Sequence, residues 1–101
     1  MKGYVIKVTY LSGEHKGRSY FLKKGGYIYS DGEFVLADNV YKSEAIAKRV
    51  CSLYANNNKR DYLNERSYNE YRISKGYKAY DWFVHELESY EPYELDETVI
   101  I

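Results

Sequence analysis

Two glycine-containing turns that lie close together limit what this chain can fold into. Gly25-Gly26 and Asp31-Gly32 can both supply the positive backbone φ of tight hairpin turns, and β-forming residues flank each of them within Arg18–Leu36. β-rich runs joined by such turns pair antiparallel. The pattern therefore predicts a small antiparallel sheet, with a type I′ hairpin at Asp31-Gly32 that leads into a strand over Glu33–Leu36.

The N-terminal residues supply the other strands of this sheet. Tyr4–Leu11 alternates with period two, which places Tyr4, Ile6, Val8 and Tyr10 on one face. The polar stretch Ser12–Gly17 reads as an exposed hairpin loop. A second strand over Arg18–Lys23 and a short third strand over Tyr27–Ser30 complete a meander of three or four strands.

The hydrophobic period then changes to that of a helix. Ser43 stands at the N-cap position, and Glu44 is favourable to the helix dipole. An apolar stripe follows, made of Ile46, Ala47, Val50, Leu53 and Tyr54. The run Asn56-Asn57-Asn58 is expected to end the helix, because Asn is a poor residue in a helix interior.

The second half of the chain gives weaker signals. Residues Lys59–Tyr80 allow a second helix, which Ser74-Lys75-Gly76 would end. Trp82–Tyr90 fits either a helix capped by Asp81 or a strand; the β-rich Trp-Phe-Val favours a strand that pairs beside the first one and ends at Pro92. Thr98–Ile101 fits a short docked strand or a frayed end.

These elements predict an α+β domain that spans residues 1–101. An antiparallel sheet of three to five strands is packed by one clear helix, and the acidic segment 86–101 is expected to be partly flexible. A lone Cys51 excludes an internal disulfide and fits a reducing compartment. No apolar run is long enough to span a membrane, so we expect a cytoplasmic protein.

The net charge of zero conceals an asymmetry along the chain. Residues 1–30 carry six basic residues and one acid, whereas residues 82–101 carry six acids and no Lys or Arg. Carboxylates interleaved with tyrosines fit a surface that occupies a basic, nucleic-acid-binding groove of a protein partner. The alternative is a solvating tail. The candidate partner-binding residues are Glu86, Glu88, Tyr90, Glu91, Tyr93, Glu94, Asp96 and Glu97.

The basic first third offers a second candidate surface. Cations can meet phosphates while tyrosines stack on bases, so direct DNA or RNA binding is the alternative function. A solvated sheet edge, protected by lysines, is the structural alternative. The candidate residues are Lys16, Arg18, Tyr20, Lys23, Lys24, Tyr27 and Tyr29.

Two resemblances bear on function. Three strands followed by a helix that opens with YKSEAIAKRV, Tyr41–Val50, resemble the sheet-plus-helix DNA-binding domains of phage-type integrases, although the loop over residues 37–40 departs from their spacing. In length, composition and architecture the chain is similar to small proteins of phages and mobile elements, and among these to anti-CRISPR proteins. The second resemblance implies stoichiometric inhibition of a CRISPR effector nuclease.

No catalytic motif accompanies these surfaces. His15 and His85 lie in separate segments, and Cys51 is expected on the apolar side of the helix, so nothing orders a nucleophile and a base together. Two histidines and one cysteine do not make a closed zinc site. We therefore expect a binding protein without catalytic activity, cofactor or metal; the sequence indicates no oligomeric state.

Overall fold

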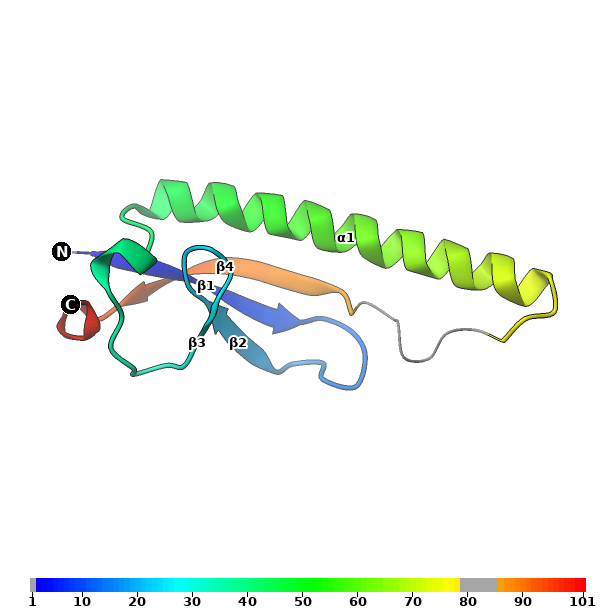
Figure 1. Cartoon of the computed structure of the whole chain (residues 1–101), viewed down its shortest axis with the longest axis horizontal. Helices are drawn as coiled ribbons and strands as arrows, with labels where there is room; N and C mark the ends of the chain where they lie inside the picture. Colours follow the sequence, from blue (N-terminus) through cyan, green and yellow to red (C-terminus); the bar gives the residue numbers. More distant parts are fainter. Residues whose placement is uncertain (1, 79–85) are drawn as a thin grey trace.

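The computed structural model describes residues 2–78 and 86–101 and shows the predicted α+β fold. The strands β1 (Gly3–Tyr10), β2 (Ser19–Leu22), β3 (Ile28–Tyr29) and β4 (Glu88–Leu95) form one antiparallel sheet in the order β3-β2-β1-β4. The helix α1 (Glu44–Ser74) lies along one face of this sheet (Figure 1). Two 3-10 turns, η1 (Ala37–Asn39) and η2 (Glu97–Val99), lie near the end of the sheet where both chain termini are found.

The two faces of β1 build two separate apolar clusters. Tyr4, Ile6 and Val8 face α1, where they pack with the helix residues Ala47 and Cys51. On the opposite face lies a second cluster, formed by Val5, Tyr29, Val35, Val40 and Leu95. The alternation predicted for the first strand is confirmed, because its even-numbered residues pack toward α1 and Val5 packs on the opposite face.

The strands follow the predicted meander up to β3 and depart from the prediction after that strand. Gly25 and Gly26 have φ of +91° and +85°, as the first turn requires. At the second turn only Gly32 has a positive φ, +88°, and the Glu33 N–H donates to the Ser30 carbonyl over 3.0 Å. A type I′ turn needs positive φ at both central residues, so that prediction was wrong.

The strand predicted over Glu33–Leu36 is also absent from the sheet. Val35 instead forms a single parallel bridge with Ile100, and Val35 is buried, at 3% exposed, in the cluster on the face away from α1. The C-terminal residues are therefore docked on the 33–36 segment. Burial of Val35 and Ile100 against the sheet explains why this segment leaves the meander.

The fourth strand of the sheet comes from the C-terminal part of the chain. β4 pairs with β1 from Gly3 opposite Leu95 to Tyr10 opposite Glu88, as expected of a last strand beside the first. The prediction that Pro92 ends the strand was wrong, and residues 82–85 of the predicted strand lie outside the described residues. β4 is an edge strand, and the proline lies opposite Ile6, whose backbone groups point toward β2, so its missing N–H faces away from the ladder.

The helix begins where the sequence predicts. The Ile46 N–H donates to Oγ of the N-cap Ser43 over 3.2 Å. At the other end Gly76 has φ of +82°, and the N–H groups of Gly76 and Tyr77 donate to the carbonyls of Ile73 and Arg72, which is the Schellman pattern. The predicted stop at Ser74-Lys75-Gly76 is confirmed.

The predicted helix end at Asn56-Asn57-Asn58 was wrong, because α1 continues through these residues as one helix of 31 residues. Asn58 is buried, at 6% exposed, and bonds to the chain just before and at the start of β4. The buried face runs through Ala47, Cys51 and Asn58, whereas the predicted stripe members Ile46 and Leu53 are 45% and 57% exposed. Cys51 lies on the packed side, as predicted.

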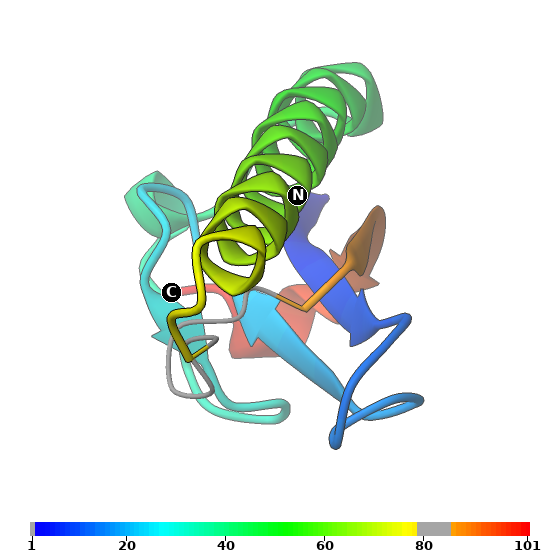
Figure 2. The same ribbon diagram turned by 90° about the vertical axis from the view of Figure 1, so that its right-hand side faces the viewer.

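The helix is longer than the sheet that it covers. The molecule measures 56 × 22 × 19 Å, and the C-terminal part of α1 extends beyond the strands (Figure 1). The view along the long axis shows α1 above one face of the sheet (Figure 2). Along the sheet α1 packs mainly on β4 and β1. Within residues 2–78 and 86–101, no helix has the length and apolar character that crossing a membrane requires.

Candidate functional site

The acidic segment after residue 86 is built into the fold. Eight of its residues pair with β1 along the whole length of β4, and Leu95 is buried. Beyond β4 the Ile101 N–H donates to Val35 and the Val35 N–H donates to Val99, over 2.8 and 2.9 Å. The carboxylates of this segment are therefore carried by an ordered strand and a docked turn.

Two of the predicted partner-binding residues lie between the sheet and the helix. Oε2 of Glu88 accepts a hydrogen bond of 2.6 Å from Oη of Tyr20, and Oε1 accepts one of 3.3 Å from Nδ2 of Asn58. The Tyr90 phenol lies near the same carboxylate. Burial, and then the neighbouring Glu88 carboxylate, raise the pKa of both Tyr20 and Tyr90 above the ordinary range, so these phenols stay protonated as donors. Only Asn58 belongs to α1, so it is the hydrogen bond from Asn58 that ties the helix to this cluster.

The next acids along β4 alternate between the two faces of the sheet. Glu91 lies on the face away from the helix and pairs with Lys7 over 3.9 Å. Glu94 lies on the helix side and pairs with Lys2 over 3.8 Å. Both carboxylates are more than half exposed. Because β4 is an edge strand, side chains on its two faces border the same open edge of the sheet.

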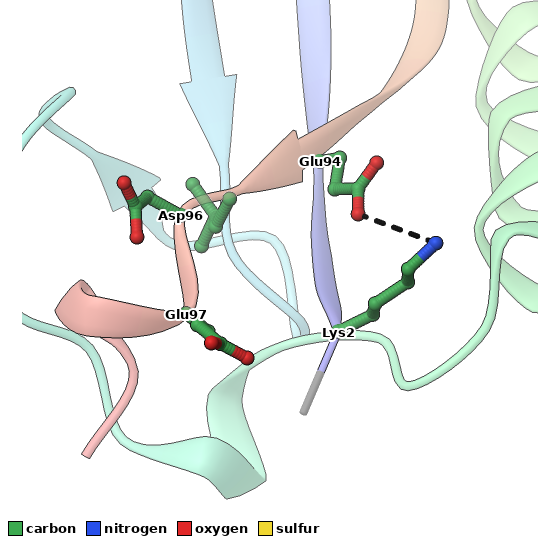
Figure 3. A pocket seen from close by; sticks show the side chains of 5 residues that line it. Lys2, Glu94, Asp96 and Glu97 are labelled. Carbon is green, nitrogen blue, oxygen red and sulfur yellow. Dashed lines mark ion pairs between the residues drawn. The ribbon is translucent and has the colours of Figure 1, made fainter.

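The acids beyond β4 continue this surface. Figure 3 shows Lys2, Glu94, Asp96 and Glu97 around a hollow of about 400 Å³. Oδ1 of Asp96 accepts hydrogen bonds of 2.9 Å from both the N–H and the hydroxyl of Thr98, which lowers the pKa of Asp96. We call the exposed set Glu91, Glu94, Asp96 and Glu97 the acidic edge.

The two remaining members of the predicted acidic set lie apart from this edge. The Glu86 side chain packs on the β1–β2 loop, where a Cβ on Gly13 would lie only 2.7 Å from Cδ of Glu86. Tyr93 packs in the apolar cluster on the face away from α1, with its ring centroid 4.8 Å from that of Phe21. Neither of these two side chains belongs to the acidic edge.

The structure does not bring the predicted basic surface together. Lys16 and Arg18 lie at the start of β2, and Lys23 and Lys24 lie just past its other end. Of the tyrosines between them, Tyr20 bonds to Glu88, Tyr29 is only 2% exposed, and Tyr27 is 72% exposed. A single groove with four cations and three stacking rings is not formed.

Several contributing residues were missed from the sequence. Asn58 gave a misleading signal, because an Asn run resembles a helix end. Lys2 gave no signal of its own, since its role depends on the pairing of β1 with β4.

Cys51 is buried, and desolvation raises the pKa of its thiol, which makes it a poor nucleophile. His85 lies outside the described residues.

Among residues 2–78 and 86–101, no three His, Cys, Asp or Glu side chains come close enough to hold a metal ion together. No protein-family model, curated protein sequence or solved structure matches this chain.

Proposed function

We propose that this protein is a non-catalytic inhibitor that uses the acidic edge to occupy a cationic, nucleic-acid-binding surface of another protein. The observation that carries the proposal is the attachment of exposed carboxylates to a strand that pairs with β1 along its whole length and to a docked turn. Carboxylates held on an ordered backbone lose little conformational freedom on binding, whereas those of a flexible tail lose much more.

The charge balance of this edge supports an electropositive partner. The described residues that follow Leu87 include no Lys or Arg. Lys2 pairs with Glu94 over 3.8 Å and Lys7 pairs with Glu91 over 3.9 Å, and all four side chains are at least partly exposed. Such exposed pairs contribute little energy and exchange easily for the cations of a partner. The chain resembles anti-CRISPR proteins in length, composition and architecture, so CRISPR effector nucleases are the first class of partner to test.

The test uses the full chain as bait in extracts of the organism that carries its gene. A captured protein is then purified, and its nucleic-acid binding is followed by fluorescence anisotropy as the chain is added. We expect a stoichiometric loss of nucleic-acid binding that weakens as salt rises. The triple variant Glu91→Gln, Glu94→Gln, Glu97→Gln should lose the effect.

A matched control neutralises three carboxylates elsewhere, with Glu14→Gln, Asp61→Asn and Glu70→Gln, and should inhibit like the natural chain. Asp96 is left unchanged because it caps the turn before Thr98. Inhibition that survives in the acidic-edge variant would contradict the proposal, as would a captured partner that does not bind nucleic acid.

A further inference from the structure

The helix leaves part of its own side of the sheet open. α1 packs mainly on β4 and β1, whereas Ile28 of β3 lies opposite Leu22 on the same face and is 64% exposed. Between the β1–β2 loop and β3 this uncovered face is hollowed by about 470 Å³. The lining residues are Tyr10, His15, Arg18, Ser19, Tyr20 and Ile28.

Aromatic rings form one wall of this hollow. The Tyr10 ring lies between those of His15 and Tyr20, with centroid distances of 5.6 and 5.5 Å and tilts of 47° and 43°. Oη of Tyr20 is fixed by its hydrogen bond to Glu88. With the exposed Ile28 side chain, the Tyr10 ring offers a largely apolar surface to a planar group.

The backbone holds the adjoining loop in place. The Gly17 N–H donates to the Tyr10 carbonyl, and the Tyr10 N–H donates to the Arg18 carbonyl, over 2.9 and 3.0 Å. The loop is tied to the chain before β4 as well, because the Leu87 N–H donates to Oγ of Ser12 over 2.9 Å. The positions of His15 and Arg18 beside the rings are therefore set by the hairpin.

One cationic group, Arg18, borders the hollow on the loop side. Arg18 is exposed, and in the described part of the chain its guanidinium forms no ion pair with a carboxylate. Of the neighbouring acids, Glu88 accepts a hydrogen bond from Tyr20, whereas the Glu86 side chain lies against Gly13. Burial, with smaller effects of Glu88 and Glu86, raises the pKa of Tyr10, which keeps its hydroxyl protonated as a donor.

We propose that this hollow binds a nucleotide, with the base against Tyr10 and Ile28 and the phosphate on the guanidinium of Arg18. A planar ring joined to an anion matches an aromatic wall next to a guanidinium that pairs with no carboxylate of residues 2–78 and 86–101. A guanidinium favours phosphate through paired, charge-assisted hydrogen bonds. A volume of about 470 Å³ lies within the usual range of small-ligand sites. This site is separate from the acidic edge and does not depend on its function.

The source of the nucleotide is either a free mononucleotide or one unit of single-stranded nucleic acid. Both offer the same base and phosphate, so the test contains an arm for each. The ¹H–¹⁵N spectrum of the full chain is titrated with dTMP, with a short oligo(dT), with thymidine and with inorganic phosphate. Saturable shifts are expected for dTMP or oligo(dT) at residues that line the hollow.

Substitutions then test whether the phosphate contacts Arg18. Arg18→Ala should weaken dTMP or oligo(dT) binding about tenfold, because it removes a charge-assisted pair. Lys24→Ala removes the same charge beyond the far end of β2 and should leave the affinity unchanged. Tighter binding of oligo(dT) than of dTMP identifies single-stranded nucleic acid as the source, and equal binding identifies the free nucleotide.

Three results would overturn the proposal. One is the absence of saturable shifts with dTMP and oligo(dT) up to about 1 mM. Another is an affinity that does not change in Arg18→Ala. The third is binding of inorganic phosphate as strong as that of dTMP, because the rings would then take no part in recognition.

Discussion

Oδ1 of Asn58, in the middle of α1, accepts a hydrogen bond of 2.9 Å from the backbone N–H of Glu88, the first residue of β4. The same side chain donates through Nδ2 to the Glu86 carbonyl, also over 2.9 Å. One amide therefore joins the helix to the strand that carries the acidic edge, and it satisfies backbone groups that would otherwise be buried without partners.

The first prediction concerns this amide. Asn58→Ala should lower the free energy of unfolding by about 2 to 3 kcal/mol, since it leaves a buried N–H and a buried carbonyl unpaired. Urea unfolding followed by circular dichroism measures the change. Asn56→Ala, at an exposed position of the same helix, should be neutral or slightly stabilising, because Ala is the better helix former. Equal effects of the two substitutions would show that Asn58 acts only through helix propensity.

A second prediction tests the hydrogen bond between Tyr20 and Glu88. A double-mutant cycle with Tyr20→Phe and Glu88→Ala should give a coupling energy of about 1 to 2 kcal/mol, because the phenol donates to a carboxylate in a partly buried position. The matched cycle replaces Tyr27, which is 72% exposed, and should give a coupling near zero. A coupling near zero for Tyr20 would mean that this bond between β2 and β4 does not stabilise the fold.

A third prediction concerns the start of α1. Ser43→Ala should destabilise the fold by about 1 kcal/mol, since the Ile46 N–H loses its side-chain acceptor at the N-cap. Ser52→Ala changes the same residue type at an exposed position inside the helix and should not destabilise. Chemical denaturation of the two variants side by side gives the comparison, and equal losses would rule out a capping role.

A fourth prediction concerns alkaline pH. Burial, with a smaller effect of Tyr54, raises the pKa of Tyr41 to about 12, against an ordinary value of 10.0. Between these values the unfolded chain loses this phenolic proton while the folded chain keeps it. The stability that Tyr41 contributes is thus complete below pH 10 and is lost as pH rises from 10 to 12.

Urea unfolding at a series of pH values from 8 to about 12 tests this expectation. Tyr41→Phe should make the decline above pH 10 shallower, because Phe has no proton to lose. A profile of the same steepness in that variant would assign the alkaline loss to other groups.

The sequence alone determined the elements whose signals are local. Alternation specified β1 and its two faces, Gly25-Gly26 specified the first tight turn, and Ser43 specified the start of α1. Gly76 specified a helix end, although the sequence assigned that end to a separate second helix. Each of these signals acts through the backbone of a few neighbouring residues, so it holds whatever the rest of the chain does. The asymmetry of charge along the chain likewise follows from the sequence alone.

Tertiary structure decided the rest. Asn58 stays helical because its amide meets partners some 28 to 30 residues away, and Pro92 stays in a strand because β4 lies at an edge of the sheet. Likewise, only the pairing of β1 with β4 places Lys2 beside Glu94, and only the path of α1 leaves Ile28 uncovered above the aromatic hollow. These outcomes depend on contacts between distant residues, whose energies can exceed local preferences of about 1 kcal/mol or less.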